Sequence, residues 1–265
     1  MRDIIEVVNH LNRIPNGITK PSKIQANDGN VYVMKCIHEN CSGKILFNEL
    51  IAYRLGILLE IPMPRCEIGL LTSEVIEKTD LLIELNAKNG SCFLSSYRAG
   101  SAKISPIIAN NIVNCSDIAK ILVFDQIILN NDRARNDGNL YYDKKEKKLL
   151  AIDHSHIFIN GEIWSVNELQ KLKNASPVLV TNLLGRNYKV FSAHLTGHSC
   201  FHDIRQKVQD IRPQEIRDLF INIPEEWGIN EDEKKSCLEL INEQMAQIDG
   251  IIRELQNIYS IRKGG

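Results

Sequence analysis

Short runs typical of strands, separated by polar segments, mark the first third of the chain. Residues 20–25 and 31–36 are two such runs, and they flank the polar sequence Asn27-Asp-Gly-Asn30. Asp and Gly tolerate the positive φ angles that a tight turn needs, so this pattern predicts a β-hairpin. Two further runs, residues 66–71 and 81–85, are also typical of strands.

One helix is expected within this strand-rich part. Hydrophobic residues recur on one side of a helix over residues 46–59. The sequence Ile61-Pro-Met-Pro64 follows, and it ends the helix because proline cannot continue one. Residues 86–100 are polar and contain glycine, which is typical of a connector between two lobes.

The rest of the chain is mainly helical in pattern. Ser116 is expected to cap a helix with an apolar face, and a last helix is expected over residues 231–259. Residues 140–142 and 149–152 flank a charged turn and predict a second hairpin.

This order of elements predicts an α+β fold with two lobes. The small, strand-rich N-terminal lobe would span residues 1–85, and the larger, mainly helical C-terminal lobe would span residues 86–265, with a cleft near residues 80–100.

Composition narrows the possible partners. The 265 residues carry a formal net charge of −1, so a broad electrostatic grip on nucleic acid or on an anionic membrane is not indicated. The seven cysteines are scattered and form no CxxC pair, which favours reduced thiols in a cytosol. The N-terminus lacks the apolar run of a signal peptide, and no stretch has the length of a membrane span. A cytoplasmic protein is therefore expected.

Lys35 and Glu49 are the first candidate functional pair. Lys35 ends a predicted strand and Glu49 lies near the start of the helix that follows. A strand lysine fixed by a helix glutamate is how protein kinases hold the α- and β-phosphates of a nucleotide. An exposed strand-end lysine and a glutamate favoured by the helix dipole would give the same pattern.

The sequence Asn16-Gly-Ile-Thr-Lys-Pro21 precedes the first hairpin. Gly17 and the hydroxyl of Thr19 would let backbone amides and a side chain approach phosphate oxygens. With a single glycine, the segment matches neither a GxGxxG nor a Walker pattern, and a plain turn remains the alternative.

An acid, an asparagine and a second acid follow in the next part of the chain. Asp132 begins a loop after an apolar helix, which suits a general base or a residue that orients a hydroxyl. Asn139 precedes one strand of the second hairpin and Asp153 follows the other, so their oxygen atoms suit Mg²⁺. Ordinary turn chemistry is the alternative for Asp132 and Asn136. It is weaker for Asp153, which directly follows an apolar strand.

These segments, in this order, resemble the HipA-like kinase family. The resemblance is to its short single-chain branch, whose catalytic segment is similar to that of phosphatidylinositol 4-kinases. It covers roughly residues 14–160 and rests on the segments already quoted, on Asn48-Glu-Leu-Ile-Ala52, and on the sequences Asn131-Asp-Arg133 and Ile152-Asp-His154.

The resemblance implies a protein-kinase-like fold and an ATP- and Mg²⁺-dependent phosphotransferase. Lys35 would contact the nucleotide phosphates with support from Glu49, and Asp132 would be the catalytic acid. Asn139 and Asp153 would bind the metal. A Ser/Thr hydroxyl on a protein is the implied acceptor, with a lipid or small-molecule hydroxyl as the alternative.

Two departures from the family pattern affect the site. The usual spacing from the catalytic Asp leads to Asp137, so the metal-binding residue is assigned to Asn139, which precedes an apolar strand, with Asn136 as the alternative. The loop that contains Gly17 and Thr19 has fewer glycines than is usual for the family.

Other functions make different demands on the sequence. A nucleotide-binding pseudokinase module would normally lack Lys35, Asp132 or Asp153, and all three are present. A zinc site would draw on the four residues His194, His198, Cys200 and His202, but the Cys-x-His spacing fits no common structural zinc motif. The apolar stripe of the last helix is shorter than a sustained coiled-coil seam, so packing within the chain is expected rather than oligomerisation.

Overall fold

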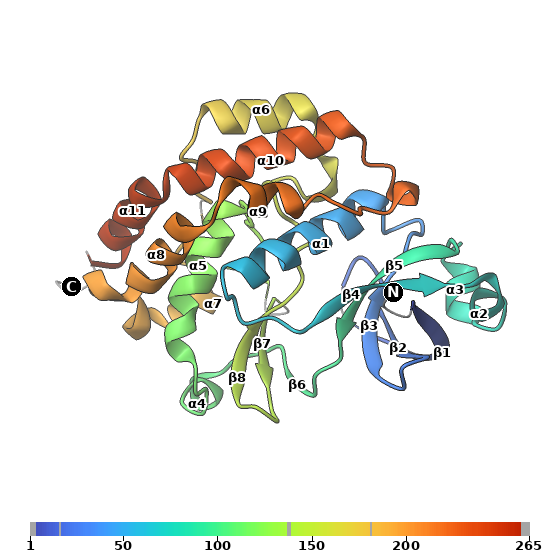
Figure 1. Cartoon of the computed structure of the whole chain (residues 1–265). Coiled ribbons are helices and arrows are strands. Elements are labelled where there is room, and N and C mark those ends of the chain that lie inside the picture. Colours follow the sequence, from blue (N-terminus) through green and yellow to red (C-terminus); the bar gives the residue numbers. More distant parts are fainter. Residues whose placement is uncertain (1–3, 16, 137–138, 181, 261–265) are drawn as a thin grey trace. The chain divides into compact units, whose positions relative to one another are not determined.

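A computed structural model describes residues 4–15, 17–136, 139–180 and 182–260, without the side chains of His198 and Ser260 (Figure 1). The chain divides into two compact units. Unit 1 comprises Met1–Leu50, Pro64–Arg98 and Asn222–Ile229, and unit 2 comprises Ile51–Met63, Ala99–Ile221 and Asn230–Gly265. The division falls within helix α1 (Gly43–Leu58), which is where residues 46–59 predicted a helix.

Unit 1 is built on five strands that form a closed barrel in the order β1-β2-β3-β5-β4. All neighbouring strands are antiparallel except β1 and β4, which pair in parallel. The strands are β1 (Ile5–Arg13), β2 (Ser22–Ala26), β3 (Val31–Lys35), β4 (Cys66–Leu71) and β5 (Gly90–Ser96). The hairpin predicted around Asp28-Gly29 is β2–β3, and the strand predicted at residues 66–71 is β4.

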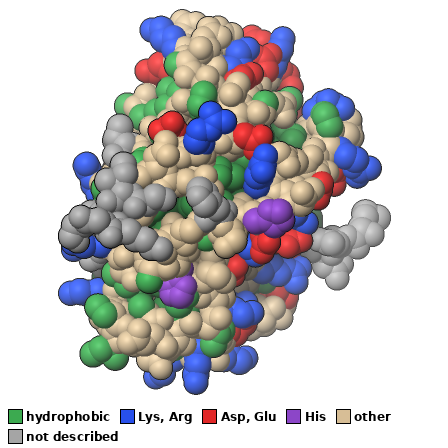
Figure 2. Space-filling model, turned by 90° about the vertical axis from the view of Figure 1, so that its left-hand side faces the viewer, with side chains coloured by type: hydrophobic (Ala, Val, Ile, Leu, Met, Phe, Trp, Pro, Cys, Tyr) green, Lys and Arg blue, Asp and Glu red, His purple; other side chains and the backbone are tan. Residues whose placement is uncertain are grey.

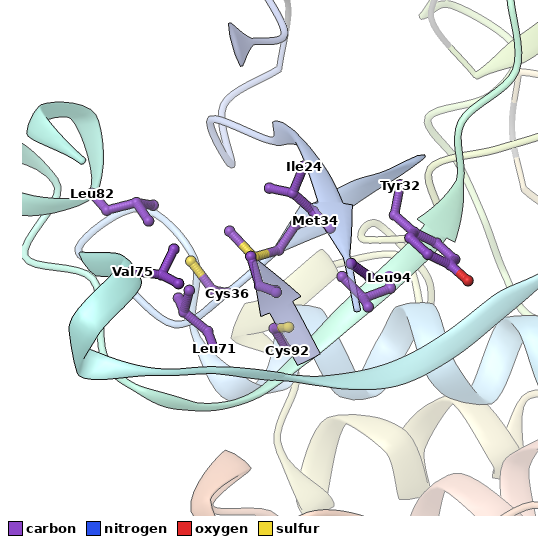
Figure 3. Close-up of a cluster of buried hydrophobic side chains, with 11 residues drawn as sticks. Ile24, Tyr32, Met34, Cys36, Leu71, Val75, Leu82, Cys92 and Leu94 are labelled. Carbon is purple, nitrogen blue, oxygen red and sulfur yellow. The ribbon is translucent and has the colours of Figure 1, made fainter. Parts of the chain in front are cut away.

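The core of unit 1 follows the two-residue period of its strands. Tyr32, Met34 and Cys36 alternate along and just beyond β3, and all three are buried. Cys92 and Leu94 do the same on β5, and these side chains gather in one cluster (Figure 3). Because successive side chains of a strand point to opposite faces, Lys35 lies on the other face of β3 from this cluster.

Two elements of unit 1 differ from the sequence prediction. The connector expected at residues 86–100 is largely strand β5. The strand has polar residues at both ends, so its buried segment Cys92-Phe-Leu94 was not recognised as part of a strand. The strand expected at residues 81–85 is the short helix α3 (Asp80–Glu84), which follows α2 (Ser73–Glu77). Of its apolar run only Leu82 is buried, as one face of a helical turn allows.

Unit 2 contains a second, three-stranded sheet and most of the helices. Its strands pair antiparallel in the order β6 (Gly100–Ser101), β7 (Leu140–Asp143) and β8 (Lys148–Ala151), so the second predicted hairpin is confirmed. The helices are α4 (Pro106–Ala109), α5 (Ile118–Ile127), α6 (Val166–Asn174), α7 (Arg186–Lys189), α8 (His202–Asp210), α9 (Pro213–Asp218), α10 (Glu231–Ala246) and α11 (Ile248–Ser260).

Helix α5 lies at the centre of unit 2, and nine of its ten residues are buried. Apolar residues lie on all sides of the helix, with a few polar residues among them, as expected of a helix that is surrounded by protein. The cap expected at Ser116 is not formed, because Ser116 lies in the 3₁₀ turn Cys115–Asp117 and Asp117 is the N-cap residue.

The helix expected over residues 231–259 is interrupted. Asn230 begins α10 with a capping box, and Gln247 separates α10 from α11. Helix α10 lies beside α6 (Figure 1). The apolar stripe of the two helices is buried, in agreement with packing within the chain; it comprises Ile241, Met245, Ile248, Ile252 and Leu255.

The surface carries charges of both signs. On the face drawn in Figure 2, Lys and Arg side chains are interspersed with Asp and Glu side chains, as the net charge of −1 leads one to expect. Within the described parts of the chain, no helix combines the length and the apolar character needed to span a bilayer.

Candidate functional site

The structure pairs Lys35 with Glu49 inside unit 1. Glu49 lies on α1, about two turns from its start, and its Oε1 is 2.5 Å from Nζ of Lys35. The two side chains are only 8% and 3% exposed. An exposed strand-end lysine is therefore not what the structure shows. A buried charge is costly unless it is paired, so each residue offsets the cost of burying the other and fixes its position.

A neutral thiol borders this pair. The side chain of Cys66 is buried on β4, and its Sγ donates to the carbonyl of Pro64 at 3.3 Å. Burial raises the pKa of the Cys66 thiol, with a smaller contribution of the same sign from Glu49. The thiol therefore adds no charge that would compete with Glu49 for Lys35.

The loop between β1 and β2 contains Gly17 and Thr19. Gly17 has φ of +122°, a conformation that a side chain would strain, whereas Thr19 is buried. His38 fixes the loop, because its Nε2 donates to the Thr19 carbonyl at 3.0 Å while its Nδ1 accepts from the Asn40 amide. Burial lowers the pKa of His38, which favours this neutral tautomer. The preceding Asn16 lies outside the described residues.

In unit 2, the Asp132 side chain contacts both asparagines that are candidate metal ligands. Its Oδ2 accepts hydrogen bonds from Nδ2 of Asn139 at 2.8 Å and from Nδ2 of Asn136 at 3.1 Å. Asn139 is buried and Asn136 is exposed. The Asp132 amide in turn donates to Oδ1 of Asn130 at 3.1 Å, which fixes the start of the loop. Asp137, the residue at the usual family spacing, lies outside the described residues.

The β7–β8 hairpin brings Asn139 close to the segment that contains Asp153. Leu140 pairs with Ala151 in the sheet, and the Ile152 amide donates to the Asn139 carbonyl at 3.1 Å. Asn139 and Asp153 therefore lie at the same open end of the hairpin. Asp153 has φ of +56°, an uncommon value for a residue other than glycine, and such conformations cluster at functional sites. Its Oδ1 accepts from the Ser155 hydroxyl at 2.7 Å.

A buried network that the sequence analysis missed connects these residues. Arg133 and Asp125 are both fully buried, and Nε of Arg133 donates to Oδ1 and Oδ2 of Asp125 at 3.0 and 2.8 Å. Nη1 of Arg133 donates to the carbonyls of Asn139 and Ile152, the latter at 2.8 Å. One guanidinium thus joins both strands of the hairpin end.

Asp125 has a second donor within the same network. The hydroxyl of Tyr188, on α7, donates to Asp125 Oδ2. Burial raises the pKa of Asp125, and the charge of Arg133 opposes that rise. The available sequence signal was an acid within the mainly apolar helix α5, followed eight residues later by an arginine. Tyr188 carried no comparable signal.

The donor chemistry at the hairpin end fits Mg²⁺. Asn139 and Asp153 offer oxygen atoms, and Mg²⁺ is usually bound by one or two protein oxygens with phosphate and water completing its shell. For zinc, no group of three or more His, Cys, Asp and Glu residues within the described part of the chain is arranged to hold a metal. Of the four residues considered for zinc, the side chain of His198 lies outside that part, and Cys200 Sγ donates to the Gly197 carbonyl.

Comparisons with solved structures identify the fold. The proinflammatory kinase CtkA of Helicobacter pylori matches with 12% identity and a TM-score of 0.54, over 97% of this chain and 100% of CtkA. The Golgi casein kinase with Mn/ADP bound matches with 9% identity and a TM-score of 0.50, over 98% of this chain and 74% of that one. The fold is therefore protein-kinase-like, with a strand-rich N-terminal region and a helical C-terminal region, as expected.

Comparison of sequences identifies the family. No curated protein matches the chain at a significant level. The family model described as HipA-like kinase matches residues 4–168, which include Lys35, Glu49, Asp132, Asn139 and Asp153. The match covers more than half of the sequence, and the chain belongs to the HipA-like kinase family.

Proposed function

We propose that this protein is an ATP- and Mg²⁺-dependent kinase that phosphorylates Ser or Thr hydroxyls of a protein. The observation that carries the proposal is the arrangement around Asp132. Its carboxylate is held by the buried Asn139, and Asn139 shares the end of a hairpin with Asp153. A fixed acid next to two oxygen ligands suits phosphoryl transfer, which depends on positioning and charge stabilisation more than on covalent chemistry by the protein.

Each residue has a defined part in the proposed reaction. Lys35, held by Glu49, would neutralise charge on the nucleotide phosphates. Asp132 would orient the acceptor hydroxyl and take its proton as the acceptor oxygen bonds to the γ-phosphorus. The bond between the γ-phosphorus and the β–γ bridging oxygen breaks in the same step, and ADP leaves with that electron pair. Mg²⁺, when held by Asn139 and Asp153, would supply further positive charge at the phosphates.

The test is transfer of labelled γ-phosphate from ATP with Mg²⁺, to the protein itself and to a cell lysate. Asp132→Asn should lower transfer by about 10²-fold or more, the usual contribution of a positioned acid or base, and leave nucleotide binding nearly unchanged. Asp153→Asn should weaken Mg·ATP binding as well. Asp210→Asn, at an exposed position of α8, is the matched control and should behave as wild type.

The outcomes separate the candidate functions. Label that appears with wild type and not with Asp132→Asn supports the kinase, and the labelled band begins to identify the acceptor. Nucleotide binding without transfer would favour a pseudokinase module, or a lipid or small-molecule acceptor absent from the assay. Equal transfer by wild type and Asp132→Asn would remove Asp132 from its role, and absence of both binding and transfer would overturn the proposal.

A further inference from the structure

The loop that carries Asp132 begins with one hydrogen-bonded turn. The amides of Arg135 and Asn136 both donate to the Asp132 carbonyl at 3.0 Å, which closes the turn. A single turn is marginal by itself, because ordering its backbone costs entropy that one or two hydrogen bonds do not offset. The conformation of residues 132–136 therefore depends on contacts from outside the turn.

Asn187, on α7, supplies such contacts along the turn. Its Nδ2 donates to the carbonyls of Arg133 and Asn136, both at 2.8 Å. A carboxamide nitrogen carries two hydrogens, so both bonds can form together. The Asn187 backbone amide also donates, more weakly, to the Ala134 carbonyl at 3.5 Å. One residue that lies more than 50 positions away in sequence thus contacts three carbonyls of the turn.

Glycine at the residue before α7 permits this close approach. A Cβ added to Gly185 would be 2.3 Å from the carbonyl oxygen of Ala134, which is too close for any side chain at position 185. Further along α7, the Tyr188 hydroxyl donates to Asp125, the partner of Arg133. Helix α7 and the residue before it therefore hold the turn at its backbone and, through Arg133, at a side chain.

The bond between Asn187 and the Asn136 carbonyl bears directly on Asp132. Nδ2 of Asn136 donates to Oδ2 of Asp132 at 3.1 Å. The Asn136 carbonyl also accepts from the Asn139 amide at 3.1 Å, and Asn139 is the other side chain that donates to Asp132 Oδ2. Both side chains that orient the Asp132 carboxylate are thus anchored at the carbonyl that Asn187 binds.

We propose that Asn187 is a positioning residue of the kinase, which holds the turn after Asp132 so that the carboxylate is directed at the acceptor hydroxyl. This inference rests on the proposed phosphoryl transfer. Asn187 acts through the backbone of the turn, and its role requires no contact with nucleotide or acceptor. A displacement of about 1 Å at a reacting group can lower a rate about 10²-fold, so loss of the two backbone bonds should reduce kcat and leave nucleotide affinity nearly unchanged.

Two variants separate the hydrogen bonds of Asn187 from its packing. Asn187→Ala removes the carboxamide, whereas Asn187→Asp keeps its shape and faces the two carbonyls with an acceptor instead of a donor. Each should lower kcat by about 10- to 100-fold in the labelled-phosphate assay, with little change in ATP affinity. Asn187→Gln retains the donor and should recover part of the loss.

A second measurement is independent of turnover. In Asn187→Ala and Asn187→Asp, the amides of Arg135 and Asn136 should exchange hydrogen faster than in wild type, because the turn that they close has lost its external support. NMR can follow both amides in the protein without nucleotide or acceptor.

Asn114→Ala is the matched control. Asn114 is another half-buried asparagine of unit 2, and its side chain both accepts from the Leu149 amide at 2.7 Å and donates to the Leu149 carbonyl at 3.1 Å. Its removal also costs two bonds to remote backbone, so Asn114→Ala should lower the Tm about as much as Asn187→Ala does and keep the wild-type kcat.

The outcomes distinguish this inference from the proposed function. Wild-type kcat in Asn187→Ala and Asn187→Asp, with Asp132→Asn impaired, would overturn the positioning role and leave the kinase standing. The same follows if Asn114→Ala loses as much activity as Asn187→Ala, if ATP affinity falls in step with kcat, or if exchange of the two amides is unchanged. Failure of wild type to transfer phosphate to any protein would overturn the kinase and, with it, the catalytic role of Asn187.

Discussion

Removal of one partner from the buried Arg133–Asp125 pair should destabilise the fold strongly, and Arg133→Met tests this. Methionine keeps most of the length of the side chain and removes its charge and all its donors. The variant leaves Asp125, which is fully buried, with the Tyr188 hydroxyl but without the cation that contacts it directly. Breaking a buried ion pair by removing one partner costs about 3–5 kcal/mol, because the remaining charge is uncompensated. The carbonyls of Asn139 and Ile152 lose a donor as well.

This cost converts into a melting temperature that calorimetry can measure. For a chain of about this size, 1 kcal/mol corresponds to roughly 2–4 °C, so the Tm of Arg133→Met should fall by about 6–20 °C. The control is Arg205→Met, which removes a similar Arg Nε–Asp contact at the surface, where the two side chains are 48% and 52% exposed. That variant should melt as wild type does, because exposed ion pairs contribute little.

The loss of stability in Arg133→Met should also depend on pH, in a direction set by the pKa of Asp125. Burial raises the pKa of Asp125, and Arg133 opposes that rise, so the pKa rises further when Arg133 is removed. A carboxyl whose pKa is higher in the folded state favours folding when protonated. Its cost therefore grows as the pH rises from the unfolded value of about 3.9 towards the raised folded value. The Tm deficit of Arg133→Met should be larger near neutral pH than at about pH 4, where the carboxyl is protonated in the folded state of both proteins. A deficit no larger than that of Arg205→Met at either pH would refute the reasoning.

The remaining predictions concern the nucleotide and the metal. Lys35→Met should lower the Tm by leaving Glu49 buried without its cation, and it should abolish measurable ATP binding in a titration. Lys78→Met, which removes an equally short but exposed pair with Glu74, should do neither; matching losses in the two variants would contradict the assigned role. Asn139→Ala should raise the Mg²⁺ concentration for half-maximal transfer by about tenfold or more, whereas Asn136→Ala should change it little. The reverse order would assign the metal to Asn136.

The sequence predicted those helices and strands that short stretches of neighbouring residues determine. The β2–β3 hairpin, the helix α1 and the β7–β8 hairpin were predicted because turn residues, helical periodicity and proline act locally. Strand β1 was missed because among its residues only Val7 is buried, while Val8 and Leu11 are exposed. It pairs with β2, the next strand, through an irregular register, and with β4, which is remote in sequence.

Breaks within helices were also beyond the reach of local pattern. Gln247 separates α10 from α11 with neither proline nor glycine at the junction, and the apolar stripe continues across it. The run Asp80–Glu84 has too few residues to distinguish a strand from a helical turn by periodicity. In both segments the secondary structure depends on tertiary packing against residues that lie elsewhere in the chain.

The candidate site likewise contains some residues that local sequence patterns indicate and others that only tertiary contacts bring together. Asp132, Asn139 and Asp153 could be proposed together because they lie in, or directly beside, one hairpin and the loop that precedes it. The residues that hold them could not, since Tyr188 is 63 positions from Asp125 and Asn187 is 51 positions from Asn136. Hydrogen bonds over such separations leave no periodic trace in one sequence. Residues expected to act chemically could therefore be proposed from the sequence, whereas the residues that hydrogen-bond to them could not.

The buried ion pairs Lys35–Glu49 and Arg133–Asp125 raise the question of what a charged side chain contributes at these positions. A buried pair is weak evidence for stability, because well-packed hydrophobic residues in its place are often neutral or stabilising. Lys35–Glu49 in unit 1 and Arg133–Asp125 in unit 2 are nevertheless kept at 8% exposure or less. Arg133 also donates to the two carbonyls at the end of the β7–β8 hairpin, which a hydrophobic residue could not do. A charged pair confers directed hydrogen bonds that packing cannot supply. Positioning of Asn139 and of the segment leading to Asp153 is therefore the better physical reason for a guanidinium at residue 133.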